Sequence, residues 1–442
     1  MSIVRSIGLQ TLRLSGRRRK VSKVNKRIRS RAWMVGALGA TVAAGLISTP
    51  ALAASPAPVV NKASCPAEIG ITPTSILIGD FMPKVGPAAP TFIDSDKAVA
   101  LRISQENAKG GVFGRKIIVN VYDDQSTGSL QSTMATKAVE GDKVFGIIST
   151  TATDSAYPYF KANNVPVTGF NALAMATDRN AFSSIGVPSS QYVSTVIMEK
   201  LKSLGVTSSA IISHNSPSAA NSARLQVIAA GVAGIKNPLL ILDETMGTHD
   251  ATSTALRIKN SGADGAYLTM YTDGVVSIAQ ALKQQGVNLK GINGAGVGDP
   301  AVINKSGGAL EGINTVSQTV PIGVPGHPAV RTFANGMKAA GANPYGSITG
   351  IAFTSADLMI AGLKLAGPCP TREKFISALR NVTNFTGSGM LPVPISFKPG
   401  LLPNGSPVKC AWFITVKGSQ PVPDAAATCG KLVDISTGQA VG

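Results

Sequence analysis

The sequence predicts an α/β protein of two doubly wound, Rossmann-like lobes joined by a hinge that the chain crosses several times. Short apolar runs alternate with segments of helical periodicity, and these runs are apolar at every position rather than at every second one. Such runs are typical of parallel strands that helices cover on both faces. The length of 442 residues is too great for one ordinary core, and it suits two lobes of about 150–200 residues each.

The first series of strands and helices should form the sheet of the first lobe. Predicted strands cover 75–80, 116–121 and 144–148, a fourth starts at 165–167, and predicted helices cover 94–108, 130–140 and 155–161. The first helix ends at Gly110 and Gly111, a glycine signal that is common at helix C-termini. The alternation of strand and helix predicts a parallel sheet that helices cover on both faces.

A second series begins near residue 189 and should form the second lobe. Predicted strands cover 209–213, 239–243, 266–270 and 291–293, and predicted helices cover 191–204, 221–230, 255–261 and 275–285. Two further helices, at 328–340 and 348–366, have no sheet of their own nearby and should return to the first lobe. We therefore assign 72–185 and 327–395 to the first lobe, and 186–326 and 396–442 to the second lobe with the C-terminal strands. The hinge crossings then fall near 185–188 and 320–326, and paired lobes of this kind close around ligands.

The first 53 residues have the pattern of a cleavable export signal. A basic segment precedes an apolar stretch at 32–47, and Ala51 and Ala53 supply the small residues of an A-x-A cleavage site. The stretch is shorter than the roughly 20 residues of a comfortable membrane span, which argues against the alternative of an uncleaved anchor. We expect cleavage after Ala53, a linker at 54–71, and a mature protein in the periplasm, at the cell surface or secreted.

Most of the positive charge belongs to this export signal. Residues 1–53 carry 11 of the 41 lysines and arginines and none of the 23 acidic residues, so the formal charge falls from +18 to +7 after cleavage. The remaining basic residues are spread out and do not cluster with aromatic residues. The sequence therefore gives no support to nucleic-acid binding.

Four cysteines follow the export signal, and an even number in an exported chain favours disulfides. Cys410 and Cys429 flank a short segment, and we expect them to pair, a closure worth on the order of 3 kcal/mol. Cys65 and Cys369 then pair by elimination. A lipid anchor on Cys65 is the alternative, although Lys62 and the long gap after the apolar stretch argue against it.

One segment resembles a known family. Residues 106–116 read E-N-A-K-G-G-V-F-G-R-K, and Tyr122, Asp123 and Asp124 follow. This pattern resembles the N-A-x-G-G-x-x-G turn and the later Y-D-D of leucine/isoleucine/valine-type solute-binding proteins. Those are type I periplasmic binding proteins that serve ABC importers. Residues 146–151, 164–167 and 267–282 are similar to further parts of the family pattern in the same order, and the resemblance covers about 72–417.

Ligands of open α/β sheets bind outside the carboxyl ends of the strands. In the first lobe this rule selects the hydroxyl-rich turn after the third strand and the segment after the fourth; the candidates are Ser149, Thr150, Thr151, Ala152, Phe170, Asn171 and Ala172. We expect this turn to stand directly before the next helix, whose free backbone N–H groups, together with the hydroxyls, can hold a carboxylate. The resemblance implies the same role for this turn. The alternative is that Thr151 or Thr153 only caps the helix.

The second lobe contributes Tyr271 and Thr272, which follow a strand, and Ala295. Tyr271 would cover the ligand from across the cleft, and an ordinary core tyrosine is the alternative. The resemblance implies a glutamate at the position of Ala295, where amino-acid receptors pair it with the ligand's ammonium, and a cleft tyrosine at the position of Ala219. Because an unpaired buried charge is costly, these departures make a carboxylate, an amide or an apolar solute at least as good a candidate as an α-amino acid.

The sequence contains no catalytic set. It lacks a G-x-S-x-G elbow, a P-loop and a G-x-G-x-x-G fingerprint, and its three histidines are scattered, so we predict neither an enzyme nor a metal or cofactor site. The Asp123–Asp124 pair is interpreted as a turn or cap. The resemblance implies a receptor that delivers a small organic solute to an ABC permease and its ATPase subunit, with membrane contact only through that partner or the export signal. A ligand sensor of the same fold, a secreted enzyme and a non-binding surface relative are the alternatives.

Overall fold

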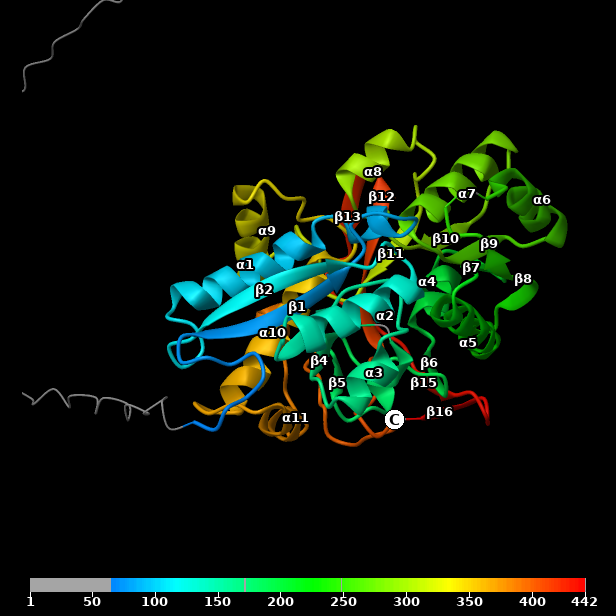
Figure 1. Cartoon of the computed structure of the whole chain (residues 1–442). Coiled ribbons are helices and arrows are strands. Elements are labelled where there is room, and N and C mark those ends of the chain that lie inside the picture. Colours follow the sequence, from blue (N-terminus) through cyan, green and yellow to red (C-terminus); the bar gives the residue numbers. More distant parts are fainter. Residues whose placement is uncertain (1–64, 171, 248, 442) are drawn as a thin grey trace, which may run out of the picture. The chain divides into compact units, whose positions relative to one another are not determined.

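The computed structural model describes residues 65–170, 172–247 and 249–441. The predicted export signal and the first part of the linker lie outside these ranges, as does Asn171. Figure 1 shows that the described residues form two α/β lobes. The helices and strands are named below by the labels of Figure 1.

The first lobe is built on a five-stranded parallel sheet with the order β2-β1-β3-β4-β5. Its strands are β1 (Ser75–Met82), β2 (Lys116–Asp123), β3 (Gly146–Ser149), β4 (Val167–Gly169) and β5 (Ala181–Ser183). Its helices are α1 (Ser95–Ala108), α2 (Gly128–Thr136), α3 (Tyr157–Ala162), α9 (Pro328–Ala339), α10 (Thr349–Leu365) and α11 (Arg372–Leu379), with short helical turns η2 (Ala89–Phe92), η3 (Lys137–Gly141), η4 (Leu173–Ala176) and η5 (Gly387–Gly389).

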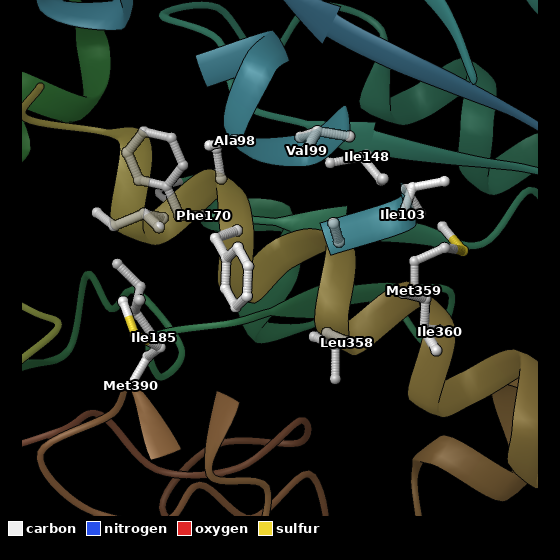
Figure 2. Packing of buried hydrophobic residues seen from close by; sticks show 14 of the residues in the cluster. Ala98, Val99, Ile103, Ile148, Phe170, Ile185, Leu358, Met359, Ile360 and Met390 are labelled. Carbon is white, nitrogen blue, oxygen red and sulfur yellow. The ribbon is translucent and has the colours of Figure 1, made fainter. Parts of the chain in front are cut away.

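Helices from distant parts of the sequence cover this sheet. One face packs against α1 and α10, and α10 is buried over most of its length because apolar residues occupy nearly its whole circumference. Figure 2 shows this core, in which Ile103 of α1, Ile148 of β3 and Met359 of α10 lie together. The other face packs against α2 and α3. The two late helices α9 and α10 thus belong to the same core as α1, although more than 200 residues of sequence separate each of them from α1.

The second lobe has a mixed sheet with the order β13-β12-β11-β10-β9-β7-β8. The strands are β7 (Ser208–His214), β8 (Lys236–Glu244), β9 (Gly265–Thr269), β10 (Gly291–Gly294), β11 (Asn314–Ser317), β12 (Cys410–Lys417) and β13 (Gln420–Pro423), with β14 (Thr428–Cys429) paired to β12. Within this sheet the antiparallel pairings are those that β12 makes with β11, β13 and β14, and the other pairings are parallel. The helices are α4 (Val196–Ser203), α5 (Pro217–Ala233), α6 (Ala251–Ser261), α7 (Thr272–Gln284) and α8 (Pro300–Lys305).

The prediction of one helix over 191–204 is wrong at its start. Residues Tyr192–Ser194 form strand β6, and α4 begins only at Val196. The reason is tertiary pairing: β6 joins β15 (Leu432–Asp434), which also pairs with β16 (Gln439–Val441), and Val193 lies opposite Val433. A partner almost 240 residues away converts an apparent helical turn into a strand.

Both expected disulfides are present. Cys410 is bonded to Cys429, and Cys65 is bonded to Cys369. The second bond ties the start of the described chain to the loop after α10. The first joins neighbouring strands β12 and β14, where the two cysteines lie opposite each other.

Candidate functional site: the cleft between the lobes

The two lobes meet where the parallel strands of both sheets end. Thr91, in the short turn after β1, accepts a hydrogen bond from the backbone N–H of Thr272 at 3.0 Å, and its hydroxyl lies 3.2 Å from the Thr272 hydroxyl. Thr272 is the first residue of α7, so one of the free N–H groups of this helix is satisfied by a side chain of the other lobe. This contact brings the carboxyl ends of both sheets together.

Four rings extend across the same contact. Phe92 of the first lobe lies 6.2 Å from Phe170, which follows β4, and 6.1 Å from Tyr271, which precedes α7. Tyr271 in turn lies 5.2 Å from the ring of His214, the last residue of β7. The rings therefore link both lobes, and each comes from the segment after a strand or from the strand's end.

Buried surroundings keep this cluster uncharged. Burial lowers the pKa of His214 to about 4, and its Nδ1 lies 3.3 Å from the backbone oxygen of Glu244, which can only accept. The imidazole is therefore neutral at physiological pH, with its proton on Nδ1. Burial, with the Asp124 and Asp154 carboxylates nearby, raises the pKa of Tyr271 to about 12. Phe92, Phe170 and His214 are buried, so the half-buried Tyr271 is the member of the cluster whose ring and hydroxyl a ligand can reach.

The hydroxyl-rich turn after β3 is arranged differently from the prediction. α3 starts at Tyr157 and its N-cap is Ala156, so the turn does not stand directly before a helix, and neither Thr151 nor Thr153 caps one. Both hydroxyls instead donate to Asp124, at 3.4 Å for Thr153. Burial raises the pKa of the Asp124 carboxyl. An acidic group, rather than a row of free N–H donors, therefore accompanies this turn.

The predicted candidates do not all reach the cleft. Ser149 and Thr151 are buried at the end of β3, and Thr150 is fully buried, with its N–H donating to the Phe81 oxygen at 2.9 Å. Ala172 is buried in the core on the α2–α3 face, and half-buried Ala152 packs against the opposite core. Asn171 lies outside the described residues.

The structure brings Phe170, Tyr271 and Thr272 together and adds three residues that the sequence did not suggest, Thr91, Phe92 and His214. His214 could have been found, because it closes the strand predicted at 209–213. Thr91 and Phe92 lie in a short turn of the 3-10 type that has no apolar periodicity to mark it.

Ala295 borders a pocket beside this contact, here called the cleft pocket, which is defined by Thr91, Ala295, Gly296, Thr319, Tyr345 and Ser347. Its empty volume is about 1050 Å³, part of it open to solvent. All residues that line it lie in the described part of the chain, and none of them is charged. The pocket therefore offers apolar surface, hydroxyls and backbone groups next to Ala295.

Two kinds of feature are absent from the described ranges. No helix there combines the length and apolar character that a membrane crossing requires. No group of three or more metal-type side chains gathers in that part of the chain either.

Two α/β lobes that meet at the carboxyl ends of both sheets are typical of solute-binding proteins that close around a ligand. The family of periplasmic binding proteins matches residues 75–421, so the chain belongs to that family, whose members work outside the cytoplasm.

Curated relatives and solved structures agree with this assignment. The chain is 28% identical over 246 residues to the Leu/Ile/Val-binding protein homolog 7 of Brucella suis, a match that covers 52% of this chain and spans 61% of the relative's length. A branched-chain amino acid ABC transporter protein of Thermus thermophilus with bound valine has a TM-score of 0.68 at 17% identity, over 81% of this chain and 97% of that one. A solute-binding protein of R. palustris in complex with benzoate has a TM-score of 0.68 at 16% identity, over 83% and 98%. At these identities the two solved structures show the fold alone.

Proposed function

We propose that this protein is an extracytoplasmic receptor that captures a small organic solute between its lobes and delivers it to an ABC importer. The observation that carries the proposal is the ring cluster of Phe92, Phe170, Tyr271 and His214, to which both lobes contribute. Relatives named for amino-acid binding support a small organic solute.

We place the solute against Ser149, Phe170 and Tyr271, with Thr272 and Ala295 at its edge. Closure around the hinge brings the second-lobe contacts to a solute first bound by the other lobe, and the solute then selects the closed form. The permease of the importer would recognise that form.

The charges around the cleft disfavour an α-amino acid. Ala295 provides no carboxylate for an ammonium, and none of the residues lining the cleft pocket is charged. Asp124 is buried, accepts from Thr151 and Thr153, and would repel the carboxylate of a ligand whenever it is ionised. We therefore propose an apolar solute with an uncharged polar group, such as an amide, in preference to a zwitterion.

Three molecules with the same branched body separate these classes: leucine, 4-methylpentanoate and 4-methylpentanamide. We expect the amide to raise the melting temperature most, 4-methylpentanoate less, and leucine least, because stabilisation follows affinity by mass action. Differential scanning fluorimetry at equal concentrations measures the order. Stabilisation by leucine alone would contradict the proposed solute class, and no stabilisation by any of a wider panel of organic solutes would contradict the receptor function itself.

Ala295→Glu tests the same point from the protein side. A carboxylate at this position gives an ammonium a partner of its own, whereas Asp124 already accepts from Thr151 and Thr153, so leucine affinity should rise by about tenfold or more. Ala295→Gln is the matched control, because it adds nearly the same volume without charge and should leave leucine binding weak. Calorimetric titration of both variants gives the comparison, and equal leucine affinity in the two would show that Ala295 does not face the bound solute.

A further inference from the structure

A second pocket lies at the hinge, separate from the ring cluster. This hinge pocket is defined by Ile185, Val187, Gln226, Val316, Val393 and Val408. All three chain crossings between the lobes border it: the segment after β5, the segment after β11, and the segment that leads to β12. Its empty volume is about 1180 Å³, part of it open to solvent, and none of the described residues proposed above as solute contacts lines it.

The lining of the hinge pocket is polar but uncharged. Hydroxyl and amide groups of Ser189, Tyr192, Asn221 and Ser222 stand among valines, leucines and isoleucines. No lysine, arginine, aspartate, glutamate or histidine is among the residues that line it, all of which the structure describes. A charged group that enters such surroundings without a partner of opposite charge loses its hydration, which is strongly unfavourable. The pocket therefore fits an uncharged molecule.

Gln226 marks one polar position within it. The side chain is 6% exposed, and its Nε2 donates to the backbone oxygen of Ser194 at a long 3.5 Å. The other amide atom, Oε1, is buried without a hydrogen-bond partner among the described residues. A buried acceptor without a donor is unfavourable. Because the last torsion of glutamine is broad, a small turn of the amide can direct this oxygen to a donor in the pocket.

We infer that the hinge pocket is a second binding site for an uncharged molecule with an apolar body and one N–H or O–H group. That group would donate a hydrogen bond to Oε1 of Gln226. This inference does not rest on the proposed function, because it uses neither the ring cluster nor the cleft pocket. A molecule bound here touches all three crossings and stabilises one arrangement of the lobes.

Three probes that share the same octanoyl chain test the site: octanamide, methyl octanoate and octanoate. Octanamide is uncharged and has N–H donors, methyl octanoate is uncharged without a donor, and octanoate is charged at pH 7.5. By calorimetric titration of the full chain we expect octanamide to bind about five- to tenfold more tightly than methyl octanoate, the effect of one neutral hydrogen bond. Octanoate should bind at least tenfold more weakly than octanamide.

Substitutions then locate the binding. Gln226→Leu should lower octanamide affinity about five- to tenfold and leave methyl octanoate unchanged. Gln280→Leu is the matched control: its Nε2 also donates to a backbone oxygen, that of Ser306 at 3.4 Å, but it does not line the pocket, so binding should not change. Val393→Phe changes a half-buried position of the lining and should lower the affinity for both uncharged probes at least fivefold. This variant replaces Gln226→Leu in the test if Gln226→Leu does not fold.

Equal octanamide affinity in the native protein, Gln226→Leu and Val393→Phe would overturn the inference. Octanoate binding as tightly as octanamide would overturn the proposed ligand class.

Discussion

Replacing Asp80 with asparagine should stabilise the protein at pH 7.5 and flatten the dependence of its stability on pH. Asp80 is fully buried in β1, and neither carboxyl oxygen has a hydrogen-bond partner within the described ranges. Burial, followed by the negative charge of Asp96, raises the pKa of this carboxyl from 3.8 to about 8. The native protein therefore holds a proton that the unfolded chain releases.

The sign of the effect follows from proton linkage. Below the pKa of 3.8 that Asp80 has in the unfolded chain, its carboxyl is protonated in both the folded and the unfolded state. The contribution of this group to the free energy of unfolding is then at its maximum. As pH rises from about 4 to about 8, only the unfolded chain loses its proton, and the free energy of unfolding should fall by about 1.4 kcal/mol per pH unit. Asparagine cannot ionise, so Asp80→Asn should gain about 3–5 kcal/mol relative to the native protein at pH 7.5.

Urea unfolding between pH 4.5 and 8 measures this difference. Asp154→Asn is the control, because Asp154 is exposed and its replacement should shift stability by no more than about 0.5 kcal/mol at any pH. An unchanged pH slope in Asp80→Asn would mean that Asp80 is ionised and paired in the native protein.

Gly296→Ala should be the most damaging small substitution at the contact between the lobes. Gly296 has φ +79°, and a Cβ there would lie 1.9 Å from the Thr272 hydroxyl and 2.9 Å from the Ser347 hydroxyl. Alanine therefore adds backbone strain and displaces Thr272 from Thr91. We expect a loss of about 2–4 kcal/mol in the free energy of unfolding and weaker solute binding.

Gly312→Ala separates the effect of backbone strain from the effect of the close contact with Thr272. Gly312 has nearly the same φ, +78°, but a Cβ there would meet no atom within 4 Å. This variant should lose only the backbone strain, about 1–2 kcal/mol, and should bind solute as the native protein does. Equal losses of stability and binding in the two variants would show that the close approach of Gly296 to Thr272 is not needed.

Local patterns were sufficient for most of the fold. The parallel strands of the first sheet and the Cys410–Cys429 bond could be predicted, because apolar runs, glycine stops and short cysteine spacing are encoded locally. The Cys65–Cys369 bond followed only by elimination, and the return of α9 and α10 to the first core only from the lack of a sheet near them in the sequence. Strand β6 could not, since only its pairing with β15 at the far end of the chain makes it a strand.

The cleft was predictable in position but not in chemistry. The rule that ligands bind at the carboxyl ends of strands selects the segments after β3, β4 and β9, and two of these segments supply Phe170 and Tyr271 to the ring cluster. It could not indicate that Asp124 takes the hydroxyls of Thr151 and Thr153, because that depends on the packing of the β2 end against the turn. Nor could it place Phe92 between Phe170 and Tyr271, since this requires the two lobes to be in contact.

The most direct measurement is a crystal structure of the protein soaked or co-crystallised with 4-methylpentanamide. Our account predicts density for the amide between the lobes, in contact with Phe170, Tyr271 and Ala295, with Thr91 and Thr272 still joined across the closed cleft. Density for the amide only on the outer surface, with nothing held between the lobes, would contradict it.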